Sequence, residues 1–182
     1  MNRILSPQSD FKTLIGLFHE DPTSVGTFVS VDGSDVPEPA RGLLDHNEHM
    51  TVTVERFHQS PVRVEILQAI AIENWYCREI LLRHESDDRV VQYGIVRLNL
   101  SLLSEPVREE ILARQKPLGR LLIEYNVLRE VRLRELYRVS PGPVLQNVFA
   151  ISAADECYGR TAIIDCDAVP AIELLEIVPP VS

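Results

Sequence analysis

Cysteine and basic residues are scarce in this 182-residue chain. The three cysteines, Cys77, Cys157 and Cys166, lie far apart and form no CxxC pair. This pattern argues against a structural zinc site or a disulfide framework, and favours small buried thiols. The 18 Lys and Arg residues are outnumbered by 27 Asp and Glu residues, which gives a net charge of -9. Such a charge argues against nucleic acid or an anionic membrane as the main partner.

Long apolar runs are missing as well. No stretch approaches the ~20 apolar residues that span a bilayer, and Met1–Glu20 lacks the pattern of a signal peptide. We therefore expect a cytoplasmic protein, either a monomer or a small homo-oligomer. The apolar content of 45% and the charged content of 25% are ordinary for a globular protein. We predict a single domain over residues 1–182, with an N-terminal helix and an irregular segment in residues 1–40.

Several well-known functional motifs are absent. The sequence contains no G-x-S-x-G, no P-loop and no G-x-G-x-x-G. The segment Asp45-His46-Asn47-Glu48-His49 spaces two histidines three residues apart, but a third ligand is not evident, and zinc needs three or four. We expect a polar turn there, and no metal and no cofactor in the protein.

The chain does contain alternating apolar and polar residues from His49 onward, a pattern typical of β-strands. Strands are expected at Met50–His58, Val62–Ile72, Trp75–Leu82, Arg89–Leu98, Val127–Val139, Tyr158–Asp165 and Val169–Val178. Helices are expected at Ser9–Glu20, after Ser104, and at Leu118–Tyr125, with an irregular stretch from Asp21 to Ala40. Short strands joined by tight turns imply antiparallel pairing, so the predicted class is α+β.

The strand Trp75–Leu82 places an arginine on an apolar face. Because alternate residues of a strand share a face, Arg78 lies beside Tyr76, Ile80 and Leu82. Arginine does not lose its proton in proteins, so a guanidinium in such surroundings needs an anion. The sequence leaves two interpretations open: a carboxylate from elsewhere in the chain, or a ligand.

Two further stretches carry candidate polar groups. Lys116-Pro117-Leu118-Gly119-Arg120 places Pro and Gly before a short helix, where free backbone N–H groups attract anions; an ordinary helix start is the alternative. In the last strand, Glu173 and Glu176 lie on opposite faces among apolar residues. A carboxylate on an apolar face needs a partner or a raised pKa, and periodicity does not choose between the two residues.

These segments resemble the chorismate pyruvate-lyase family. The resemblance rests on Trp75–Leu82, Lys116–Arg120, Tyr158-Gly159-Arg160, and the last strand with Glu176, in that order; Leu43-Leu44-Asp45 leading to Met50 also matches. It covers roughly residues 40 to 180, nearly all of the predicted elements. It implies a chorismate lyase-like fold: a single antiparallel sheet of about six strands with helices packed on one side.

The resemblance also implies an activity, the cofactor-independent removal of pyruvate from chorismate to leave 4-hydroxybenzoate. Arg78 would then bind the ring carboxylate with help from the backbone N–H of Leu118. Glu176 would face the ring hydroxyl and Met50 would line the pocket. Arg78 and Glu176 are thus the expected catalytic residues, and Arg78, Leu118, Gly119, Met50 and Glu176 the expected substrate-binding residues.

The sequence departs from the family pattern at two places. Some members have Arg directly after the Gly of the following strand, whereas here Ile95 follows Gly94 and the nearest arginine is Arg97. The last strand has one additional residue before Glu176, which keeps Glu173 as a rival acid. The alternative function is a non-catalytic domain of the same fold that binds a small aromatic carboxylate.

Overall fold

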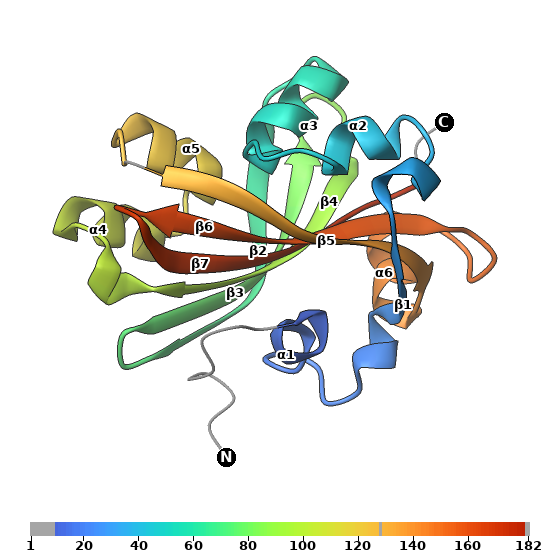
Figure 1. The fold of residues 1–182 in the computed structure, drawn as a ribbon, viewed down its shortest axis with the longest axis horizontal. Helices are drawn as coiled ribbons and strands as arrows, with labels where there is room; N and C mark the ends of the chain where they lie inside the picture. Colours follow the sequence, from blue (N-terminus) through green and yellow to red (C-terminus); the bar gives the residue numbers. More distant parts are fainter. Residues whose placement is uncertain (1–9, 128, 181–182) are drawn as a thin grey trace.

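One antiparallel β-sheet of seven strands forms the body of the protein (Figure 1). The computed structural model describes residues 10–127 and 129–180. The strand order is β1-β5-β6-β7-β4-β3-β2. The strands are β1 (Gly26–Val31), β2 (Val62–Ile72), β3 (Trp75–His84), β4 (Val90–Asn99), β5 (Arg129–Pro141), β6 (Cys157–Cys166) and β7 (Val169–Val178). The predicted α+β class with a single antiparallel sheet is therefore confirmed, with seven strands where about six were expected.

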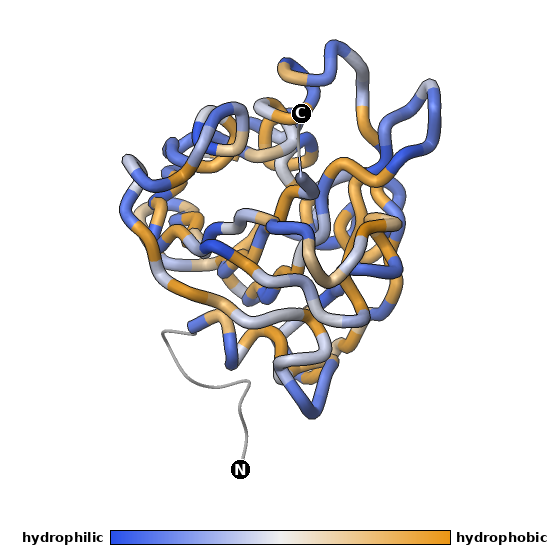
Figure 2. Tube along the Cα trace, turned by 90° about the vertical axis from the view of Figure 1, so that its right-hand side faces the viewer, coloured by the Kyte–Doolittle hydropathy of each residue, from blue (hydrophilic) through white to orange (hydrophobic). Residues whose placement is uncertain are grey.

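Four helices cover one face of this sheet. They are α2 (Ala40–Leu44), α3 (Met50–His58), α4 (Glu105–Ala113) and α5 (Leu118–Glu124). Figure 1 shows α2, α3 and α5 above the sheet, and in Figure 2 the loops that project furthest from the body are largely hydrophilic. Two short helices, α1 (Phe11–Ile15) and α6 (Pro143–Phe149), pack against the opposite face around Tyr93 and Ile95. The short 3-10 helices are η2 (Pro22–Ser24), η3 (Gly33–Asp35) and η4 (Leu100–Leu102).

The segment Met50–His58 was predicted to be a strand, and this is wrong, because it forms helix α3. Its valines and threonines favour strands by intrinsic propensity. However, Met50, Thr53 and Val54 are buried at helical spacing, and packing of that stripe overrides the local preference. The helix ends at Gln59, which has the left-handed conformation typical of a helix C-terminus.

The N-terminal region is more regular than predicted. The segment 21–40 was expected to be irregular, but it contains β1, which pairs along its whole length with β5 from Gly26↔Pro141 to Val31↔Leu136. Conversely, the helix expected over Ser9–Glu20 is confirmed only as the five residues of α1, with Asp10 as its N-cap. Helix α6, which starts at Pro143, was not predicted because its Pro and Gly residues indicated a break.

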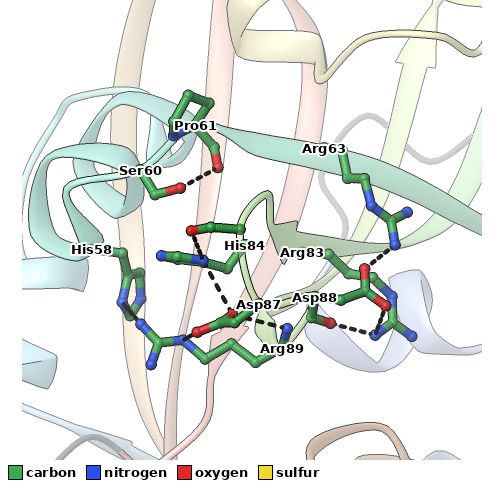
Figure 3. Close-up of polar contacts among 10 residues, drawn as sticks. His58, Ser60, Pro61, Arg63, Arg83, His84, Asp87, Asp88 and Arg89 are labelled. Carbon is green, nitrogen blue, oxygen red and sulfur yellow. Dashed lines mark hydrogen bonds and ion pairs between the residues drawn. The ribbon is translucent and has the colours of Figure 1, made fainter.

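A polar cluster fastens the β3–β4 turn to the connection between α3 and β2 (Figure 3). Asp88 binds Arg63 through its side chain, and its carbonyl oxygen accepts a hydrogen bond from Arg83. His84 Nδ1 lies 3.1 Å from Asp87 Oδ1, and Arg89 donates to His58 Nδ1 at 3.2 Å. None of these residues lines the cavity described next, so the cluster stabilises the outer end of the hairpin.

Candidate functional site

A cavity lies between the sheet and the first turns of α3 and α5. It encloses about 500 Å³ of atom-free space, open solvent at its mouth included. Arg78, Gln92, Arg160 and Glu176 contribute its charged and amide groups from the sheet. The apolar lining consists of Met50, Ile80, Leu82, Val96, Pro117, Leu118, Val131, Ile164, Leu174 and Leu175.

Strand register explains how these groups come together. Arg78 on β3 is opposite Val96 on β4, and the next row on the same face runs from Ile80 through Gly94 and Glu176 to Arg160. Gln92 follows Gly94 one further step along β4. Side chains on one face recur every second residue, about 7 Å apart along a strand. We call the side of the cavity formed by the sheet its floor. The floor therefore has Arg78 towards one end, and Gln92 with Glu176 and Arg160 towards the other.

Arg78 is fully buried and lacks a counter-ion among the residues that the structure describes. None of its three guanidinium nitrogens makes a hydrogen bond within residues 10–127 and 129–180. Burial lowers the pKa of Arg78 from its usual range, the Tyr76 hydroxyl opposes this effect, and the Arg114 charge adds to it. The Tyr76 hydroxyl is itself buried without a hydrogen-bond partner among these residues. The described residues therefore provide Arg78 with no carboxylate partner.

Glu176, and not Glu173, lines the cavity. Glu176 Oε2 accepts a hydrogen bond of 2.7 Å from Arg160 Nε, and both side chains are buried. Glu173 points to the opposite face and accepts a hydrogen bond of 2.5 Å from Arg97 Nε. Arg97 also stacks 5.0 Å from the Trp75 ring, does not line the cavity and cannot replace an arginine in it.

Arg160 also holds the loop that closes the cavity. Its Nη1 donates to the carbonyl oxygens of Leu44 at 3.2 Å and His46 at 2.8 Å. Its Nη2 donates to the carbonyl oxygen of Glu48 at 3.0 Å. These carbonyls belong to the α2–α3 connection, which leads directly into the cavity-lining residues at the start of α3. One guanidinium therefore links the floor of the cavity to its cover.

Two glycines make room for this arrangement. A Cβ at Gly119 would lie 3.1 Å from Thr51 Oγ1 and 3.3 Å from His49 Cβ, so Gly119 lets the start of α5 approach the start of α3. A Cβ at Gly94 would lie 3.3 Å from the Leu175 carbonyl oxygen and 3.4 Å from Ile80 Cγ1. Because Gly94 has no side chain, the floor of the cavity is open between Ile80 and Glu176.

His49 borders the cavity as a neutral group. Burial lowers its pKa to about 4, and the charges of Arg129 and Arg160 act in the same direction. Its Nε2 accepts a hydrogen bond of 2.6 Å from Arg129 Nε. The sequence placed His49 in a polar turn with no metal, and no group of three or more His, Cys, Asp or Glu side chains in the described residues could hold a metal ion.

The three cysteines are not part of this site. All three are buried. Burial raises the pKa of Cys77 and Cys166 to about 11 and that of Cys157 to about 12. At neutral pH the thiols are therefore protonated and poorly nucleophilic.

All five residues that the family resemblance assigned to substrate binding, Met50, Arg78, Leu118, Gly119 and Glu176, line this one cavity. The roles proposed for them stay predictions. Sequence reasoning missed Gln92 and Arg160. Gln92 is a polar residue on an otherwise apolar strand face, which is the same signal that identified Arg78. Arg160 belongs to the Tyr158-Gly159-Arg160 motif of the resemblance, but no function was predicted for it.

Comparison with solved structures shows that the fold is shared with effector domains. PhnF from Mycobacterium smegmatis matches with a TM-score of 0.53 and 9% identity over 72% of this chain and 63% of PhnF. Its separately solved effector domain matches with a TM-score of 0.53 and 7% identity over 72% of this chain and 88% of that domain. The chain thus spans less than two thirds of full-length PhnF. No family model and no curated protein matches the sequence.

The fold is therefore the chorismate lyase-like fold that the resemblance implied. The expectation of an enzyme, a chorismate pyruvate-lyase, is wrong: the solved domain that shares the fold is the effector domain of PhnF. The motifs behind that expectation place residues around a cavity, and this placement is common to binding and catalysis. None of the helices in the described residues is both long and apolar enough to cross a membrane.

Proposed function

We propose that this chain is a non-catalytic domain that binds a small aromatic carboxylate, with the carboxylate on Arg78 and the ring between the apolar walls. The observation that carries the proposal is the buried guanidinium of Arg78, which has no hydrogen-bond partner among the described residues. A buried charge without a partner is costly, and it is retained where a ligand compensates it.

The remaining features of the cavity support the same ligand class. Arg160 and Glu176 neutralise each other, so the three charged groups of the floor carry a net charge of about +1. A monoanion matches that charge. The aliphatic lining suits a flat, apolar body, and a guanidinium matches a planar carboxylate through two parallel hydrogen bonds.

The effector domain of PhnF has this fold, which supports a sensor role for the chain in which the ligand is a signal. A single domain over residues 1–182, a cytoplasmic location, and a monomer or small homo-oligomer also stay predictions from the sequence.

Isothermal titration of the purified 182-residue chain with benzoate and with benzamide, its neutral isostere, tests the proposal. Benzoate should bind and benzamide should not, since only the former brings an anion to Arg78. Arg78→Met should weaken benzoate binding by at least 100-fold, the usual cost of removing one partner of a buried charge pair. Arg56→Met is the matched control, because Arg56 is exposed and lies outside the cavity.

Two outcomes would overturn the proposal. The first is a wild-type protein that binds none of benzoate, 4-hydroxybenzoate and chorismate. The second is an Arg78→Met variant that binds them as well as wild type does. Chorismate should be bound without release of pyruvate above its spontaneous background, and enzymatic release would contradict a purely binding role.

A further inference from the structure

Gln92 lines the same cavity as Arg78, and its amide oxygen has no hydrogen-bond partner among the described residues. Its side chain is 2% exposed and it lies on β4, on the face that lines the cavity. Its Oε1 is buried without a partner among the described residues. Buried amides are nearly always hydrogen-bonded, because an unsatisfied one costs about 1–3 kcal/mol.

The position of this amide is fixed by its neighbours. Its Nε2 lies 3.6 Å from the point that a Cβ of Gly94 would occupy, so the amide extends over the open part of the floor. Ile80 and Leu82 on β3 are the residues opposite Gly94 and Gln92, and both are apolar. Neither can hydrogen-bond the amide.

The charges around Gln92 define what kind of group it can meet. The nearest charged groups of the floor, Glu176 and Arg160, are already paired with each other. A second anionic group on a ligand would face the Glu176 carboxylate and no free cation of the described floor. A neutral group that both donates and accepts hydrogen bonds, such as a hydroxyl or a carboxamide, matches the amide of Gln92.

The separation of Arg78 and Gln92 indicates where the neutral group lies on the ligand relative to the carboxylate. The two residues lie on adjacent strands and the same face, four residues apart in register, since Arg78 is opposite Val96. Four residues of a strand span about 14 Å, and two long side chains reaching towards each other leave room for one aromatic ring. The neutral group therefore lies across the ring from the carboxylate.

Resting on the function proposed above, we propose that Gln92 determines specificity: its amide recognises a neutral hydroxyl or carboxamide on the ligand, opposite the carboxylate. The ligand class is then a monoanionic aromatic carboxylate with a distal hydrogen-bonding group. Unsubstituted rings and para-dicarboxylates are discriminated against, the former because the amide stays unsatisfied and the latter because the second charge meets Glu176.

Titration of wild type and Gln92→Met with benzoate, 4-hydroxybenzoate, 2-hydroxybenzoate and benzene-1,4-dicarboxylate tests this assignment. Methionine keeps the length of the side chain and removes the amide. Wild type should bind 4-hydroxybenzoate about tenfold more tightly than benzoate, the size expected for one hydrogen bond. It should bind 2-hydroxybenzoate and the dicarboxylate no better than benzoate. Gln92→Met should bind benzoate at least as well as wild type and lose the preference for 4-hydroxybenzoate.

The outcomes separate this inference from the proposed function. If wild type binds benzoate and 4-hydroxybenzoate equally, or if Gln92→Met keeps the tenfold preference, the role of Gln92 is overturned while carboxylate binding stands. If wild type binds no aromatic carboxylate, both proposals fail. Retained benzoate affinity shows that Gln92→Met is folded, so a lost preference is not a folding defect. Should the variant not fold, Gln92→Asn, which retracts the amide by one methylene, should lower the preference for 4-hydroxybenzoate; an unchanged preference overturns the assignment.

Discussion

Arg160 Nε donates a hydrogen bond of 2.7 Å to Glu176 Oε2 on the neighbouring strand, inside the cavity. The same guanidinium binds three carbonyl oxygens of the loop between α2 and α3. A ligand that touches Glu176 therefore touches a residue whose partner, Arg160, also holds the cover of the cavity. Arg160 therefore joins Glu176 on β7 to the α2–α3 loop through direct hydrogen bonds.

Arg160→Met should lower the free energy of unfolding by about 3–5 kcal/mol, because it leaves a buried carboxylate without its cation. The loop carbonyls lose their donors as well, so backbone amides of residues 46–51 should exchange faster with deuterium than in wild type. Urea denaturation and hydrogen exchange measure the two effects. Arg138→Met on the adjacent strand is the control, since its pairing with Glu156 is exposed and should contribute less than about 1 kcal/mol. Equal stability of the two variants would contradict the structural role of Arg160.

Arg78→Met should have the opposite effect on stability in the ligand-free protein. Because the guanidinium of Arg78 has no partner among the described residues, replacing it with an apolar side chain should raise the free energy of unfolding by about 1–3 kcal/mol. Arg97→Met is the matched comparison: Arg97 is equally buried, but it compensates Glu173, so its loss should cost about 3–5 kcal/mol. Urea denaturation of both variants without ligand decides the matter. A destabilised Arg78→Met variant would mean that Arg78 is structural.

The difference between these arginines shows which features of the site can be predicted from the sequence. Period two in Trp75–Leu82 was sufficient to place Arg78 on an apolar face, and the strand exists with that face buried. The pattern does not reveal partners, because they come from strands that are distant in sequence. Arg78, Arg97 and Arg160 are all fully buried, and only the pairing of β4, β6 and β7 distinguishes the two with carboxylates from the one without.

The errors in the predicted fold have a related cause. Met50–His58 has strand-forming residues, yet it is a helix because its buried stripe packs against α5 and β2. Strand β1 lies in a segment rich in Pro and Gly, which local patterns predict to be irregular. It forms because its backbone pairs with the edge of β5. Both outcomes depend on contacts that lie more than 60 residues away in sequence, which local patterns do not contain.

The protein should lose stability in acid through His49. Its pKa is about 4 in the folded protein and 6.5 unfolded, so unfolding takes up a proton between these values. The stabilisation from neutral His49 is thus complete above pH 6.5 and is lost as the pH falls towards 4. After allowance for solvent screening, we expect the free energy of unfolding to fall by about 2 kcal/mol over this pH range.

Comparison with His49→Gln tests this pH dependence. Glutamine retains an acceptor for Arg129 but does not titrate. Between pH 7.5 and pH 4.5, the free energy of unfolding of wild type should fall by about 2 kcal/mol more than that of the variant. The pKa values of His46 and His58 are also lowered by burial, and these residues contribute equally to both proteins. Parallel pH profiles for wild type and variant would show that His49 is not responsible.

Gly94→Ala should weaken ligand binding more than it weakens the fold. The added methyl group would occupy the open floor between Ile80 and Glu176, below the ring of the proposed ligand. It would also lie 3.3 Å from the Leu175 carbonyl oxygen, a tight contact that should cost about 1 kcal/mol of stability.

Benzoate affinity should fall at least tenfold, because the added methyl group and the ring would compete for the same space over Gly94. Gly42→Ala in α2 is the control: its Cβ would meet only the flexible end of Glu38, so benzoate affinity should not change. Titration calorimetry and urea denaturation of both variants separate the two effects. If Gly94→Ala binds benzoate with wild-type affinity while losing about 1 kcal/mol of stability, the ligand does not lie over Gly94, and the site of the carboxylate ligand must be sought elsewhere along the Arg78 face.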